Sequence, residues 1–78
     1  MAVGTIATTT QDIAGDFDLY VTGVNGASPL TLQKALGTGG TEWEVVEVFG
    51  ENGQFFVKNT GTKAFKKSNS NGTAKFSQ

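Results

Sequence analysis

The chain of 78 residues contains no cysteine, no histidine and no arginine. The lack of cysteine excludes the disulfide bonds that often stabilise small secreted domains. The usual zinc ligands and the cysteine–histidine or serine–histidine pairs of many hydrolases are missing as well. Asp12, Asp16 and Asp18 gather near one turn, but their spacing does not match the EF-hand loop. We therefore predict a protein that is not an enzyme and that has no catalytic residues, metal or cofactor.

Long hydrophobic runs are also missing. No segment approaches the roughly 20 apolar residues that a membrane-spanning helix requires. The N-terminal stretch MAVGTIATTT has neither the positive charge nor the apolar run of a signal peptide. We expect no contact with a membrane and no secretion through a signal peptide.

Proline occurs once, whereas glycine occurs 11 times and threonine is equally frequent. Threonine is β-branched and favours strands. Asn-Gly dipeptides at positions 25–26, 52–53 and 71–72 are typical of the type I′ turns that close hairpins. The sequence thus predicts a mainly β fold, a small antiparallel meander forming a barrel or sandwich, in a single domain over residues 1–78.

Two segments between these turns differ in how clearly they can be interpreted. Residues 17–22 alternate strictly between apolar and polar side chains and predict a half-buried strand. Residues 29–36 fit two structures. Ser28-Pro29 is a favourable helix start and Leu32 and Leu36 have helical spacing, but Leu30-Thr31-Leu32 alternates like a strand. A short helix and a strand both remain open here.

The segment EVFGENGQFFVK, residues 47–58, predicts a hairpin around Asn52-Gly53. A two-residue turn pairs Phe49 with Phe56 and Glu47 with Lys58, which are favourable cross-strand neighbours. Both faces of this hairpin are largely apolar, so both need cover, either by closure within the chain or by another chain. The face that we predict to contact another subunit contains Trp43, Val45, Glu47, Phe49, Phe56 and Lys58.

Charge is distributed unevenly along the chain, although the net charge is only −1. Residues 1–51 contain all seven acidic side chains and one lysine, and residues 52–78 contain five lysines and no acid. The acidic and basic strands either pair within the fold or meet between subunits, where opposite charges would fix the register of an assembly.

The sequence resembles the small phage virion proteins of the head-decoration or cementing class. The features shared are an uncharged, threonine-rich start (AVGTIATTT), glycine-rich β-structure and the absence of cysteine and histidine. The resemblance implies a structural protein of the virion, assembled in the host cytoplasm, that binds itself, a capsid lattice or both as a homo-oligomer. It also implies an extended N-terminal arm within residues 1–10, with contacts from Val3, Thr5, Ile6, Thr8 and Thr10.

A monomeric binding module is the alternative hypothesis. Such a module would be a phage-encoded inhibitor of a host protein or a binder of single-stranded nucleic acid. The lysines and phenylalanines of residues 55–76 interleave as in single-strand binders, which combine a basic groove with aromatic stacking. The lack of arginine and the slightly acidic total charge make nucleic acid the weaker expectation.

Overall fold

The computed structural model describes residues 3–36 and 42–78, and this part of the chain forms strands and loops without a helix. The predicted β fold is confirmed. The strands are β1 (Val3–Ile6), β2 (Gln11–Ala14), β3 (Phe17–Thr22), β4 (Leu30–Ala35), β5 (Trp43–Phe49), β6 (Gly53–Val57), β7 (Thr62–Lys67) and β8 (Thr73–Ser77).

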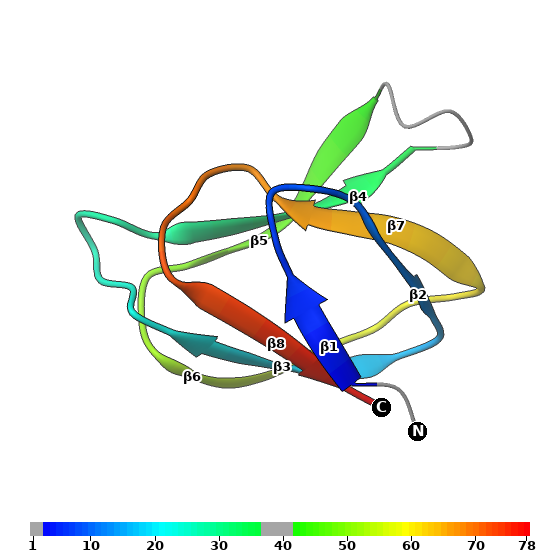
Figure 1. Ribbon diagram of the computed structural model, residues 1–78, viewed down its shortest axis with the longest axis horizontal. Helices are drawn as coiled ribbons and strands as arrows, with labels where there is room; N and C mark the ends of the chain where they lie inside the picture. Colours follow the sequence, from blue (N-terminus) through cyan, green and yellow to red (C-terminus); the bar gives the residue numbers. More distant parts are fainter. Residues whose placement is uncertain (1–2, 37–41) are drawn as a thin grey trace.

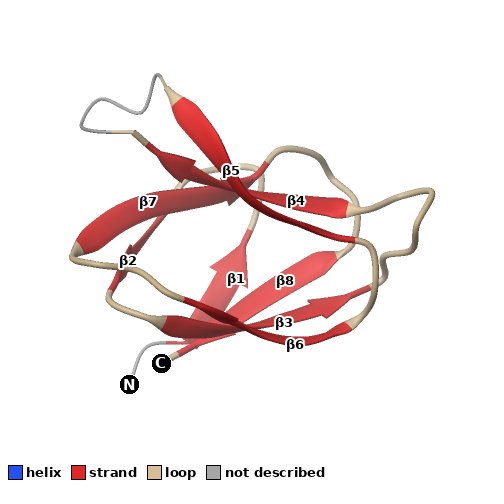
Figure 2. Cartoon of the chain, turned by 180° about the vertical axis from the view of Figure 1, so that it is seen from behind, coloured by secondary structure: helices blue, strands red, loops and turns tan. Residues whose placement is uncertain are grey.

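The strands form two antiparallel sheets that pack face to face as a sandwich (Figure 1, Figure 2). One sheet has the order β1-β8-β3-β6 and is called sheet A; the other has the order β2-β7-β4-β5 and is called sheet B. Among the described strands, β4 and β5 are the one pair of sequence neighbours that also pair in a sheet. Every other link carries the chain from one sheet to the other.

The predicted meander and its hairpin at Asn52-Gly53 are therefore wrong. β5 pairs with β4 and β6 pairs with β3, so the predicted pairs Phe49–Phe56 and Glu47–Lys58 do not form within the chain. No described residue other than glycine has a positive φ, which excludes type I′ turns centred on the Asn-Gly dipeptides.

The pairing of β6 with β3 explains this outcome. It sets Val57 opposite Phe17 and Phe55 opposite Leu19, on the side of sheet A that faces the core. The local hairpin would have gained only cross-strand contacts of about 0.2–1 kcal/mol each. Burial of large apolar side chains contributes about 1.5–3 kcal/mol per residue and decides the pairing.

The segment over residues 29–36 is strand β4, so the helical alternative is wrong. Leu30 and Leu32 are both fully buried, as alternate positions of a strand must be when one face meets the core. A helix would have buried Leu36 together with Leu32, but Leu36 is exposed.

Residues 3–6 of the expected N-terminal arm lie in the sandwich as β1, paired with β8. Ile6 is fully buried in the core, whereas Val3 and Thr5 are exposed on this edge strand. Thr8 and Thr10 are exposed in the link to β2, and residues 1–2 lie outside the described residues. Residues 3–6 are thus part of the folded sandwich rather than an extended arm.

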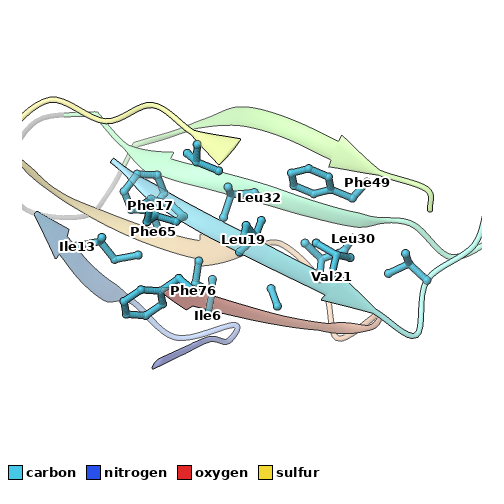
Figure 3. Packing of buried hydrophobic residues seen from close by; sticks show 13 residues of the cluster. Ile6, Ile13, Phe17, Leu19, Val21, Leu30, Leu32, Phe49, Phe65 and Phe76 are labelled. Carbon is cyan, nitrogen blue, oxygen red and sulfur yellow. The ribbon is translucent and has the colours of Figure 1, made fainter. Parts of the chain in front are cut away.

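The core lies between the sheets and is centred on three phenylalanines (Figure 3). Phe17 of β3 packs edge-on against Phe65 of β7, with ring centroids 5.1 Å apart, and against Phe76 of β8 at 6.0 Å. The predicted alternation in β3 is confirmed, since Phe17, Leu19 and Val21 are buried while Tyr20 and Thr22 are exposed. The contact between Phe17 and Phe65 joins sheet A to sheet B.

A buried asparagine closes one end of the sandwich. The Asn59 side-chain amide donates to the carbonyl oxygens of Ile13 at 3.0 Å, Gly15 at 3.1 Å and Gly61 at 3.3 Å. Its backbone N–H donates to the Asp16 carboxylate at 2.6 Å. Asn59 thereby joins the β2–β3 turn to the link between β6 and β7. The Asp16 carboxylate serves this structural contact by accepting the hydrogen bond from Asn59.

We expect Asn59→Ala to lower the free energy of unfolding by about 2 kcal/mol, because it removes three hydrogen bonds, of which the one to the Ile13 carbonyl oxygen is buried. Asn25→Ala is the matched control. The Asn25 side chain accepts from the backbone N–H groups of Ala27 and Ser28, both at an exposed turn where water can replace it. Thermal unfolding followed by circular dichroism compares the two variants, and equal shifts in Tm would contradict the role given to Asn59.

Candidate interaction surface

The two free edges on one side of the sandwich form the candidate surface. β5 is the outer strand of sheet B and β6 is the outer strand of sheet A, and the short link over residues 50–52 keeps them on the same side. β5 pairs only with β4, and β6 pairs only with β3, among the strands described. Each strand therefore presents a row of backbone N–H and C=O groups to the outside.

A groove runs between these two edges. It comprises a hollow of about 360 Å³ and an adjoining hollow of about 270 Å³, and Glu47, Phe49 and Phe55 line both. The ring centroids of Phe49 and Phe55, which line both hollows, lie 4.6 Å apart. The two hollows together are called the β5–β6 groove, and its lining residues are Val46, Glu47, Val48, Phe49, Gly50, Glu51, Phe55, Phe56, Val57 and Lys58.

Four of the six predicted interface residues line this groove. They are Glu47, Phe49, Phe56 and Lys58, which the structure brings together across the two edges without the predicted hairpin. They do not share one exposed face. Phe49 is buried in the core, whereas Phe56 is 65% exposed and points outward from sheet A.

Trp43 and Val45 lie outside the groove lining. Trp43 is half-buried on β5, where the Lys66 ammonium group lies 4.4 Å from the centre of its ring. Val45 is exposed on the same strand. The structure thus separates these two residues from the other four interface candidates.

Sequence reasoning missed a β-bulge that shapes the groove. Leu32 pairs with Glu47 and Gln33 pairs with Val45, which leaves Val46 as the extra residue of β5. Val46 packs against the core, and Val48 remains 52% exposed. At β6, the adjacent pair Phe55-Phe56 does indicate an apolar surface, because neighbours on a strand face opposite sides and only one of the two rings can face the core.

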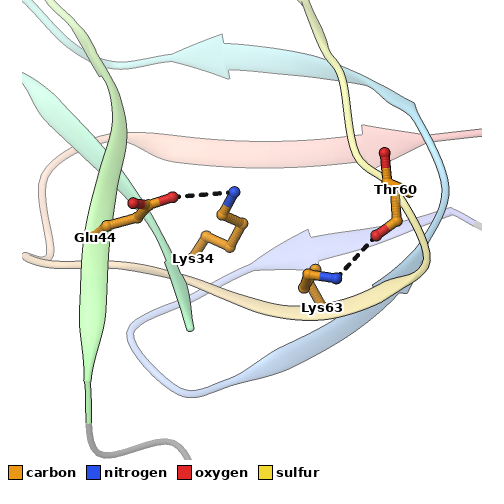
Figure 4. A network of polar contacts seen from close by, with 4 residues as sticks. All are labelled: Lys34, Glu44, Thr60 and Lys63. Atoms are coloured by element: carbon orange, nitrogen blue, oxygen red, sulfur yellow. Dashed lines mark hydrogen bonds and ion pairs between the residues drawn. The ribbon is translucent and has the colours of Figure 1, made fainter. Parts of the chain in front are cut away.

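Charge around the groove has opposite sign on its two strands. Glu47 and Glu51 line it on the β5 side, and Lys58 lines it on the β6 side. The ion pair found among the described residues lies elsewhere, between Lys34 and Glu44 at 3.0 Å (Figure 4). Both of its members come from the acidic part of the sequence. In the described chain, the five lysines of residues 52–78 thus form no ion pair with an Asp or Glu side chain.

A second, smaller hollow lies on the outer face of sheet A. It has a volume of about 300 Å³ and is lined by Val3, Tyr20, Lys75, Phe76 and Ser77. Val3 and Tyr20 are exposed there. This hollow lies at β1, β8 and β3, away from the groove between β5 and β6.

Comparison with models of known protein families, with curated proteins and with solved structures found no match. The described residues contain no helix of the length and hydropathy needed to cross a membrane. Within the same ranges, no three acidic side chains gather closely enough to hold a metal ion.

Proposed function

We propose that this protein is a non-catalytic structural subunit of a phage particle, which decorates or stabilises the capsid through protein–protein contacts. Two features support the proposal. The sequence has the character of head-decoration proteins, and the sandwich leaves two strand edges and an apolar groove uncovered on one side. The β5–β6 groove is the proposed contact surface.

The exposure of Phe56 is the observation that carries the proposal. Phe56 is 65% exposed on an edge strand and lines the groove, and Val48, which lines the adjoining hollow, is 52% exposed. Large apolar side chains gathered on a surface mark interaction sites, and aromatic residues are enriched in interface cores. Free strand edges beside them add backbone groups that a partner can pair with.

Burial of the basic region's phenylalanines argues against the nucleic-acid alternative. Phe65 and Phe76 are buried in the core, so they are unable to stack on bases. Of the aromatic side chains of residues 55–76, Phe56 is the exposed one. A single exposed ring beside Lys58 is a poor platform for a strand of nucleic acid and a good anchor for a protein partner.

The proposal is tested by the distribution of the protein between particles and free solution. We expect the wild-type chain to band with purified particles of its source phage in a density gradient. Phe56→Ser should reduce the bound fraction at least tenfold, because it removes the exposed anchor of the groove. Leu36→Ser is the matched control, since Leu36 is also an exposed apolar residue but lies outside the groove.

Two results would count against this role. One is a wild-type chain that never accompanies particles. The other is equal binding by the Phe56 and Leu36 variants, which would place the contact elsewhere on the sandwich.

A further inference from the structure

We propose that Asn25 is a site of spontaneous covalent modification, where the side-chain amide is lost and an aspartyl or isoaspartyl residue is formed. The chain contains three Asn-Gly dipeptides, at positions 25–26, 52–53 and 71–72. Glycine after asparagine favours this reaction, because it has no side chain to hinder the approach of its backbone nitrogen. The structure distinguishes the three dipeptides, since it leaves the first able to react and restrains the other two.

The reaction needs water as its one co-reactant. The backbone nitrogen of Gly26 attacks Cγ of Asn25, and the new N–Cγ bond closes a five-membered imide ring. The Cγ–Nδ2 bond breaks, and the amide nitrogen leaves as ammonia with the proton of the Gly26 N–H. Water then adds to one of the two imide carbonyl carbons and opens the ring. The new carboxylate belongs either to the side chain, which gives aspartate, or to the main chain, which gives isoaspartate.

Hydrogen bonds at Asn25 favour the first step. Its Oδ1 atom accepts from the backbone N–H of Ala27 at 2.8 Å and from that of Ser28 at 2.9 Å. Attack on Cγ places negative charge on this oxygen, and donors about 2.7–3.1 Å away stabilise such charge. The same two bonds fold the side chain back over the turn that contains Gly26. The turn thus holds both the reacting carbonyl group and the donors that stabilise its charged form.

The turn is exposed, and its hydrogen bonds are local. Residues 25–28 are all exposed, and the backbone N–H of Ser28 donates to the Asn25 carbonyl oxygen at 3.1 Å. Within the described ranges, the Gly26 N–H has no hydrogen-bond partner, and a β-carbon on Gly26 would meet open space. Ring closure therefore rearranges this turn alone and leaves the two sheets as they are.

Asn52 is restrained by a hydrogen bond to another part of the chain. Its Oδ1 atom accepts from the backbone N–H of Val24 at 3.0 Å, and Val24 is buried. Gly53 opens β6 and lies opposite Val21 of β3. Closing an imide ring at this dipeptide would break the bond between the two links and disturb the start of β6. We therefore expect slow amide loss at Asn52.

Asn71 is restrained by its amide nitrogen and by the packing of Gly72. The amide nitrogen, which would have to leave, donates to the Pro29 carbonyl oxygen at 3.1 Å. Gly72 is half-buried with a φ of +64°, and a β-carbon there would lie 2.8 Å from the Thr22 carbonyl oxygen. Ring closure would have to separate two links that pack against each other, so this dipeptide should also react slowly.

The reactive turn lies beside one end of the β5–β6 groove. A β-carbon on Gly50, which lines the groove, would lie 3.9 Å from the Gly26 Cα atom. Modification of Asn25 adds one negative charge to a chain whose net charge is −1, at the end of the groove that Glu51 also lines. An effect of this charge on binding to particles rests on the proposed function, whereas the modification itself does not.

Peptide mapping by mass spectrometry tests the site with the full chain. The folded chain is incubated in a mildly alkaline buffer, and a second sample is incubated in concentrated urea. The readout is the rate of amide loss in the folded chain divided by the rate in urea, measured at each dipeptide. Because local structure slows a reaction that requires the chain to rearrange, we expect this ratio to be at least about tenfold higher at Asn25 than at Asn52 or Asn71.

Gly26→Ala is the matched variant. Alanine fits the open space at this position without a positive φ, so the fold should be unchanged, and its methyl group hinders the attacking nitrogen. Amide loss should fall at Asn25 and stay the same at Asn52 and Asn71. Equal ratios at the three dipeptides, or amide loss at Asn25 in urea but none in the folded chain, would overturn the inference. Since no particle is present in these incubations, neither result bears on the proposed function.

Discussion

Replacing Phe17 by alanine is expected to lower the free energy of unfolding by about 3–5 kcal/mol, as is typical of buried phenylalanine. Phe17 is 1% exposed and contacts Phe65 across the core and Phe76 within its own sheet. Its removal leaves a cavity where the two sheets meet and ends two edge-to-face aromatic contacts. Folded domains of this length are stable by roughly 4–12 kcal/mol, so the loss is a large part of the total.

Thermal unfolding measures this loss, with circular dichroism and the fluorescence of the single tryptophan as probes. We expect Tm to fall by at least about 12 °C, since each kcal/mol shifts the Tm of a domain this small by about 4–8 °C. Phe56→Ala, measured at a concentration where the chain is monomeric, is the control. It removes the same side chain from the surface and should change stability by less than about 0.5 kcal/mol. A similar Tm for both variants would show that the core is not centred on Phe17.

The reason that β3 could be predicted lies in its own residues. Phe17, Leu19 and Val21 alternate with polar positions, and one face of a strand in a sandwich must meet the opposite sheet. β4 could not be decided in the same way, because Leu30, Leu32 and Leu36 satisfy both a helical and an extended pattern. Sheet A decides between the two structures, because it covers Leu30 and Leu32 of β4 and leaves Leu36 exposed.

The pairing of the strands could not be predicted from residues that are neighbours in the sequence. Asn52-Gly53 and its flanking residues predict a hairpin, but Phe55 and Val57 gain more by lying beside β3 over the core. That gain depends on residues more than 30 positions away in the sequence. Asn52 instead accepts a hydrogen bond from the Val24 backbone N–H at 3.0 Å, which binds its loop to the link between β3 and β4.

The candidate surface could be predicted only in part, because its residues are brought together by the fold and not by the predicted hairpin. Glu47, Phe49, Phe56 and Lys58 were grouped by an incorrect strand pairing, yet they line one groove because β5 and β6 end up on the same side of the sandwich. The short link at residues 50–52 enforces that proximity whatever the pairing. Trp43 and Val45 were grouped with them by alternation along β5, which the bulge at Val46 interrupts.

Gly72→Ala is expected to lower the free energy of unfolding by about 2–5 kcal/mol. Gly72 has a φ of +64°, which costs an L-residue about 1–2 kcal/mol. A β-carbon at this position would also lie 2.8 Å from the Thr22 carbonyl oxygen and would overlap the Val24 side chain. Overpacking of this kind typically costs a further 1–3 kcal/mol. The contact joins the β7–β8 link to the β3–β4 link, so relief of the overlap would separate two loops at one end of the sandwich.

Gly26→Ala provides the control, because Gly26 lacks a positive φ and a β-carbon there would meet open space. Its stability should match wild type or exceed it by up to about 1 kcal/mol, since alanine restricts the unfolded chain. Equilibrium unfolding in urea compares the two variants, with Tm as a second measure. If Gly72→Ala unfolds at the same urea concentration as Gly26→Ala, the two links are not packed as described. A large difference with Gly72 as the weaker variant would establish that the third Asn-Gly dipeptide serves the close approach of two crossing links instead of a hairpin turn.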